Sequence, residues 1–175
     1  MVMASSMARK VFPYASIGIM ILVTVGYLVF LPKKEIRQPL QYNHKVHIET
    51  AGLVCQDCHA TVQSSSSATI PRLETCSMCH SESPISESPE ERKLLEFVSA
   101  GKEIPWVRVY GVPDHVYFSH RRHVTQGKLE CSACHGNVAE FTRPVTSAFA
   151  PVTMERCMGC HRESGVTNDC LTCHR

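Results

Sequence analysis

The sequence predicts a mostly irregular fold of short α-helices with little protein core of its own, behind one N-terminal transmembrane helix. The motif C-x-x-C-H occurs five times in the 175 residues, and residues 11–31 form an uncharged apolar run. The segments between the motifs are too short to build a separate hydrophobic core around each of them. C-x-x-C-H is the attachment motif of c-type haem, whose iron takes the motif histidine as an axial ligand. We therefore expect the helices to wrap around covalently bound haems.

The five motifs use every cysteine of the chain, because there are ten cysteines in all. Zinc knuckles, redox dithiols and disulfides are the alternative interpretations of C-x-x-C pairs. Zinc sites combine paired half-sites, which an odd number of pairs fits poorly, and a redox dithiol needs no histidine after its second cysteine. We expect five covalently bound haem c groups. Their attachment residues are Cys55, Cys58 and His59; Cys76, Cys79 and His80; Cys131, Cys134 and His135; Cys157, Cys160 and His161; Cys170, Cys173 and His174.

Five of the ten histidines lie outside the motifs, one for each iron if every haem has two histidine ligands. Four of them form two H-x-x-H pairs. Residues three apart on a helical turn project on neighbouring sides, so one pair cannot straddle a single iron and should serve two haems. The expected ligands opposite the motif histidines are His44, His47, His115, His120 and His123.

The ligand role of His115 has an alternative, because this histidine is not part of an H-x-x-H pair. A methionine opposite histidine would raise the potential of that haem relative to its neighbours. Packing against a haem edge is the simpler role for a methionine near a motif. The methionines concerned are Met78, Met154 and Met158.

The apolar run predicts how the chain is placed in the cell. A transmembrane helix needs about 20 apolar residues, whereas a signal peptide has a shorter apolar region and a small-residue cleavage site. Residues 11–31 carry no charge and end at Leu31-Pro32-Lys33-Lys34, without such a site. We expect an uncleaved single-pass anchor in the cytoplasmic (inner) membrane. Since c-type haems are attached on the outer side of that membrane, residues 1–10 should be cytoplasmic and the haem domain periplasmic.

The motifs divide the rest of the chain into three parts. Residues 32–81 should carry haems one and two, residues 82–112 a linker and a spacer helix, and residues 113–175 haems three to five. The serine-rich stretch 61–70 looks flexible and is expected to be a plain surface loop.

The spacer helix has clear boundary signals. Pro89 suits the first helical position, and Gly101 follows the last helical residue. Ser88 and Glu91 have the spacing of a capping box. From Gln38 onward, 13 Lys and Arg residues stand against 15 Asp and Glu residues, with no basic patch that would suggest a nucleic-acid partner.

A free H-x-x-H followed by C-x-x-C-H resembles the class III cytochromes c, the cytochrome c3 and c7 group. The resemblance implies a c3/c7-like multihaem fold. It also implies that His44 and His120 each bind the haem of the motif that follows, while His47 and His123 reach other haems.

The whole chain resembles a narrower family on its anchor, on residues 55–80 and on the stretch PDHVYFSHRRHV at 113–124. That family contains the multihaem subunits of alternative complex III and of the related quinone reductase complex of sulfate reducers. The resemblance implies three partners: an iron–sulfur/molybdopterin-enzyme-like periplasmic subunit, a polytopic quinone-binding membrane subunit and a periplasmic electron carrier. Five motifs match the first complex, since the second usually has six haems.

These features favour an electron-transfer subunit with no catalytic residues of its own. It would pass electrons between a membrane quinone oxidoreductase complex and a periplasmic electron carrier or oxidase. A catalytic multihaem reductase would need an iron with an open coordination site, and five spare histidines argue against one. A stand-alone quinol dehydrogenase cytochrome that feeds a periplasmic reductase is the other alternative, although that type normally carries four haems.

Overall fold

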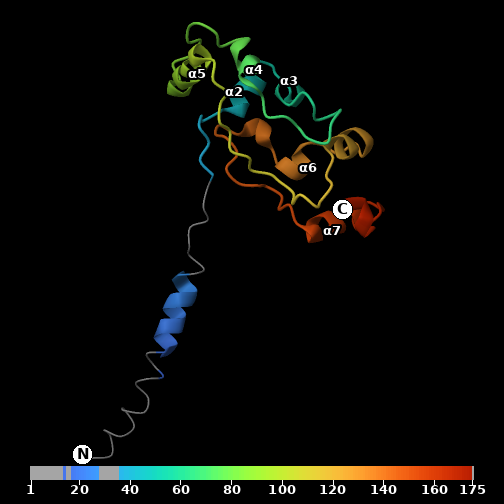
Figure 1. Ribbon diagram of the computed structural model, residues 1–175. Coiled ribbons are helices and arrows are strands. Elements are labelled where there is room, and N and C mark those ends of the chain that lie inside the picture. Colours follow the sequence, from blue (N-terminus) through green and yellow to red (C-terminus); the bar gives the residue numbers. More distant parts are fainter. Residues whose placement is uncertain (1–13, 15–16, 28–35, 175) are drawn as a thin grey trace, which may run out of the picture. The chain divides into compact units, whose positions relative to one another are not determined.

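The computed structural model describes residue 14, residues 17–27 and residues 36–174 (Figure 1). The chain divides into two units, Met1–Glu35 and Ile36–Arg175. In the first unit, residues 17–27 are helical and their apolar side chains are mostly exposed. Among the described residues, no helix is long and apolar enough to cross a membrane. Residues 1–10 and the two ends of the predicted anchor lie outside the described residues, so the anchor stays a prediction.

The second unit is a chain of short helices joined by irregular segments, as the sequence predicts. The extended pairing found in its described residues is an isolated antiparallel bridge between Val116 and His174. Each haem motif overlaps one of the short helices. The helices are α2 (His44–Glu49), α3 (Cys55–Cys58), α4 (Leu73–Ser77), α5 (Pro89–Ala100), η1 (Arg121–Gln126), α6 (Ser132–His135), η2 (Val138–Glu140), α7 (Met154–Glu163) and α8 (Cys170–Cys173).

Helix α5 has the predicted bounds. The Ser88 hydroxyl accepts a hydrogen bond from the Glu90 N–H at 3.2 Å, and Pro89 opens the helix. Gly101 ends it in the left-handed region at φ 59°, a conformation that glycine adopts without steric cost. The predicted capping box is wrong, because the Glu91 carboxylate turns away from the N-cap and bonds to His80.

The protein core of the second unit is small and lies between α4 and α5. Its buried residues are Leu40, Leu73, Leu94 and Ile104. The side chains packed against them are Cys76, Phe97, Val98 and Trp106. No described side chain of any size is less than 2% exposed. The remaining helices therefore lack a protein core that would hold them together.

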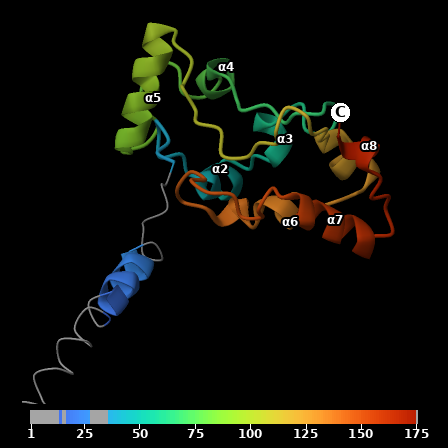
Figure 2. The same cartoon turned by 60° about the horizontal axis from the view of Figure 1, so that its bottom comes forward.

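The helices follow one another from one end of this unit to the other. Figures 1 and 2 both place α4 and α5 at one end and α7 with the C-terminus at the opposite end. Between these ends, α2 packs against η2, and the Lys45 N–H donates to the Phe141 carbonyl at 3.1 Å. The first H-x-x-H helix thus lies against the segment that follows the third motif.

Candidate haem sites

The first H-x-x-H pair is held by an aromatic ring and a backbone carbonyl. The Tyr42 ring stacks on His47 with centroids 4.4 Å apart, and its edge meets the His44 ring at 4.7 Å. His47 Nδ1 lies 2.8 Å from the Asn43 carbonyl oxygen. Asn43 also caps α2, since its side chain accepts from the Val46 N–H at 3.1 Å.

The second pair repeats this arrangement with different residues. Phe118 stacks on His123 at 4.6 Å and meets His120 edge-on at 4.9 Å. His123 Nδ1 lies 2.8 Å from the carbonyl oxygen of Ser119, four residues earlier. Here the helix is the π-helix η1, a wide turn of the kind often found at functional sites. Each unit therefore fixes both of its imidazoles with the aromatic residue two positions before the first histidine.

Four of the five free histidines lie beside a motif histidine. Four pairs of imidazole rings have centroids 5.6–6.4 Å apart, and every pair joins one free histidine to one motif histidine: His47 with His80, His115 with His174, His120 with His135, and His123 with His161. Imidazole nitrogens bind transition metals at about 2 Å, so two rings on opposite sides of one ion have centroids about 6 Å apart. The observed separations match that arrangement.

His44 is the fifth free histidine, and His59 is the motif histidine left without a ring partner. Burial, together with positive charge on His59 and His47, lowers the pKa of His44 to about 4. Four free histidines thus have a ring contact with a different motif histidine, and His44 interacts electrostatically with the motif histidine that remains.

The hydrogen bonds of the motif histidines determine which ring nitrogen is left for a metal. His59 Nδ1 lies 2.6 Å from the Thr69 carbonyl oxygen, and His161 Nδ1 lies 2.9 Å from that of Thr167. His80 Nδ1 instead lies 2.7 Å from a Glu91 carboxylate oxygen. Metal-binding histidines commonly donate their second N–H to such acceptors, which leaves Nε2 for the metal.

The serine-rich segment 61–70 is a surface loop, as the sequence predicts, and hydrogen bonds hold it in place. The Ser66 carbonyl accepts from the His120 N–H at 2.9 Å, and the Ser65 carbonyl accepts from the Arg121 N–H at 3.0 Å. The Gln63 carbonyl accepts from the Thr125 hydroxyl at 2.7 Å. These bonds attach the first haem region to the second H-x-x-H unit. The sequence gives no signal for them, because backbone carbonyls make them.

The thiols of different motifs lie close together. Burial raises the pKa of Cys76, Cys131 and Cys157, and in each case thiols of other motifs raise it further. The neighbours are Cys58 with Cys76, Cys55 with Cys131, Cys134 with Cys157, and Cys157 with Cys173. Numbered along the chain, electrostatic coupling between thiols thus links the second motif to the first, the first to the third, the third to the fourth and the fourth to the fifth.

Two of the alternative interpretations, disulfides and non-haem metal sites, are not seen among the described residues. None of the ten cysteines is in a disulfide. Among the described residues, no three His, Cys, Asp or Glu side chains converge as a non-haem metal site would require.

Comparison with known proteins decides the family. Residues 30–105 match the model of the class III cytochrome c family, and residues 116–175 match that of cytochrome c7 and related cytochromes c. The menaquinone reductase multihaem cytochrome c subunit of Nitratidesulfovibrio vulgaris is 30% identical over 184 aligned residues, which cover 91% of this chain and 88% of the relative. The chain belongs to this family of multihaem c-type cytochromes. Alternative complex III is not among the relatives that these comparisons identify.

The surface of the cytochrome suits covalent haem. Large apolar side chains are exposed beside the attachment cysteines: Val54 before the first motif, Met78 inside the second and Leu171 inside the fifth. A porphyrin face would cover such side chains. Two buried polar atoms of the described residues have no partner, His44 Nδ1 and Trp106 Nε1. Buried donors need acceptors, and the propionates of a haem near Cys76 would provide one for the Trp106 N–H, since both residues adjoin the same core cluster.

Proposed function

We propose that the chain carries five haems, each with two histidine ligands. The observation that carries this proposal is that four of the five free histidines have a ring contact with a different motif histidine, which leaves His44 and His59 as the fifth pair. His115 then completes the set, and the methionines Met78, Met154 and Met158 are left as packing residues. The ligand pairs are His44/His59, His47/His80, His120/His135, His123/His161 and His115/His174, with each haem bonded to the two cysteines of its motif.

We propose that the cytochrome transfers electrons within a quinone oxidoreductase complex. The name of its Nitratidesulfovibrio relative, a subunit of menaquinone reductase, supports this function and favours a complex of that type over alternative complex III. The five-haem count, in contrast, is the one expected of the latter. The proposed partners are an iron–sulfur/molybdopterin-like periplasmic subunit, a polytopic quinone-binding membrane subunit and a periplasmic electron carrier.

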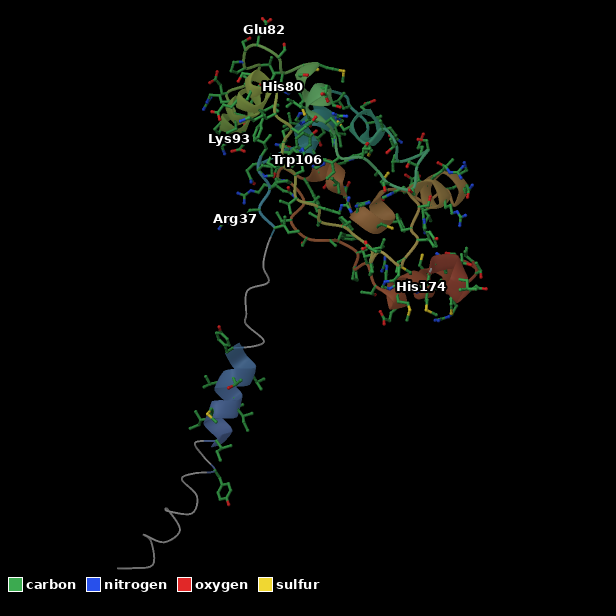
Figure 3. The ribbon with its side chains drawn as sticks, in the orientation of Figure 1. Arg37, His80, Glu82, Lys93, Trp106 and His174 are labelled. Atoms are coloured by element: carbon green, nitrogen blue, oxygen red, sulfur yellow. The ribbon has the colours of Figure 1, made fainter. Side chains whose placement is uncertain are left out.

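The neighbouring thiols support a single file of haems in the order two, one, three, four, five. Figure 3 shows His80 beside α5 and His174 at the opposite end of the unit, and these are the motif histidines at the two ends of the file. Electrons would enter at one end and leave at the other. The proposed file of haems does not branch, because the thiols of each motif are coupled to the thiols of at most two other motifs.

The residues of the chain hold and shield the haems, which supply the one-electron redox chemistry when bound. Tyr42 and Phe118 fix the orientation of two imidazoles each. The carbonyl oxygens of Asn43 and Ser119 hold the Nδ1 atoms of His47 and His123, which leaves Nε2 of each ring free to bind a metal. Two histidines would hold each haem, and no iron position would then be left for a substrate. This is the arrangement of an electron carrier rather than of a catalytic site.

We also propose that residues 11–31 anchor the chain in the inner membrane with the haem unit in the periplasm. The absence of charge in this run and the helical conformation of residues 17–27 support the anchor. Alkaline carbonate extraction of membranes is the direct test. The anchored chain stays in the membrane pellet, whereas release of the intact chain into the supernatant would contradict the proposal.

The function is tested on the native assembly. Tagged cytochrome is purified from mildly solubilised membranes, its partners are identified by mass spectrometry, and a menaquinol analogue is added under anaerobic conditions. We expect both proposed subunits to copurify and the haems to exchange electrons with the quinone pool only in their presence. A chain that purifies alone and oxidises menaquinol by itself would be a stand-alone quinol dehydrogenase. Turnover of nitrite or hydroxylamine would indicate a catalytic reductase.

A further inference from the structure

Among the described residues, Glu91 is the one charged or polar residue that is buried, and it contacts a motif histidine. Its carboxylate accepts hydrogen bonds from His80 Nδ1 at 2.7 Å and from the Ile85 and Ser86 N–H groups at 2.8 Å each. The Ser86 hydroxyl donates to it as well. All four partners are donors, so the arrangement suits an ionised carboxylate.

No other motif histidine has this environment among the described residues. His59 and His161 place Nδ1 against neutral backbone carbonyls. The ion pairs of the described chain include one histidine, His80, whose side chain is 17% exposed while that of Glu91 is 4% exposed. The contact is therefore shielded from water, which would otherwise weaken the effect of the charge.

We propose that Glu91 makes the second haem the lowest-potential haem of the chain. An ionised acceptor at Nδ1 draws the proton away from the ring and raises the basicity of Nε2 toward the iron. Hydrogen bonds to an axial ligand and a buried negative charge nearby are both means by which a protein lowers a haem potential. Reduction adds one electron to the ferric iron, with no bond formed or broken. Glu91 acts through His80, so it is a positioning residue.

The position of the second haem indicates the direction of electron flow along the file, an inference that rests on the proposed function. The second haem is at the α5 end of the file. Electrons move spontaneously from a low-potential to a higher-potential site. The α5 end is therefore where electrons enter, and the donor subunit binds there. The acceptor binds at the end formed by α7 and α8.

The test is a potentiometric titration of the purified holo-cytochrome, followed haem by haem by EPR and visible spectra. Glu91→Gln keeps the size and an acceptor oxygen but removes the charge. We expect it to raise the lowest midpoint potential by at least about 59 mV, which corresponds to a tenfold change in the equilibrium constant of a one-electron reduction. The matched control is Glu90→Gln, which removes the same charge from the neighbouring residue. The Glu90 carboxylate bonds to Lys93 and to the Gln41 N–H instead of to a histidine. It should leave all five potentials unchanged.

A second variant tests the sign. Ser86→Ala removes one donor from the carboxylate and leaves more of its charge to His80, so the same haem should stay at its potential or move lower. Five unchanged potentials in Glu91→Gln, or a rise in Ser86→Ala equal to that in Glu91→Gln, would overturn the proposal.

A third variant keeps the proposal testable if Glu91→Gln does not fold. His47→Met changes the ligand opposite His80 and so identifies the second haem by its EPR signal and potential. If the haem that responds is not the lowest-potential haem of the wild-type protein, the proposal is wrong. A wild-type protein with fewer than five low-spin haems would contradict the proposed function instead, so the two failures are distinguishable.

Discussion

Gly136 follows the haem ligand His135 directly, and replacing it with alanine should destabilise the cytochrome in two ways. Its backbone has φ +69° and ψ −168°, a region that only glycine adopts readily. Holding alanine there costs about 1–3 kcal/mol. A Cβ atom would also lie 2.8 Å from Cδ2 of Phe149, and such overpacking costs about 1–3 kcal/mol. We expect the free energy of unfolding to fall by about 2–6 kcal/mol in total.

A matched control separates the two effects. Gly165 has φ +66° with nothing within 4 Å of its added Cβ, so Gly165→Ala should show backbone strain alone. Denaturant unfolding of the holo-protein, followed by far-UV circular dichroism, measures both variants. Gly136→Ala should be less stable than Gly165→Ala by about 1–3 kcal/mol. Equal losses in the two variants would refute the packing of Phe149 on Gly136.

Three further predictions concern other parts of the molecule. His115→Ala should convert one haem, the one bound at His174, to a high-spin form that binds carbon monoxide, while four low-spin haems in the EPR spectrum remain unchanged. Leu94→Ala should lower the free energy of unfolding by about 2–5 kcal/mol, because Leu94 is 9% exposed in the small core; a loss under 1 kcal/mol would show that the core is not needed. Hydrogen bonds from Lys93 and the Gln41 N–H lower the pKa of Glu90 below 4.5, so its contribution to stability is complete above that pH and is lost as the pH falls through the lowered pKa. The stability difference between wild type and Glu90→Gln should therefore shrink in acid, and a difference that grows there would contradict it.

The candidate residues could be read from the sequence because the attachment chemistry is local. C-x-x-C-H places two thiols and a ligand on one turn of chain, so the ten cysteines and the motif histidines can be read directly. The bounds of α5 were also predictable, since Pro89 and Gly101 act through their own backbone preferences. The absence of a large core followed from the short spacing of the motifs.

Contacts between distant segments could not be predicted in this way. The spacing of Ser88 and Glu91 suits a capping box, in which the Glu91 carboxylate would accept from the Ser88 N–H alone. In the folded chain it accepts from four donors on His80, Ile85 and Ser86 instead. The serine-rich loop looked flexible because its side chains are small and polar, whereas its carbonyl groups hold η1. The pairing of His115 with His174 depends on an antiparallel bridge between Val116 and His174, which no local pattern announces.

We propose that five haems, each with two histidine ligands, form a file without an open iron. An EPR-monitored redox titration of the purified holo-chain, with carbon monoxide added to the reduced form, is the decisive test of this arrangement. We expect five low-spin haems with separate midpoint potentials and no carbon monoxide binding. A high-spin iron that binds carbon monoxide or cyanide in the native protein would contradict it, because at least one histidine pair would then not enclose a haem.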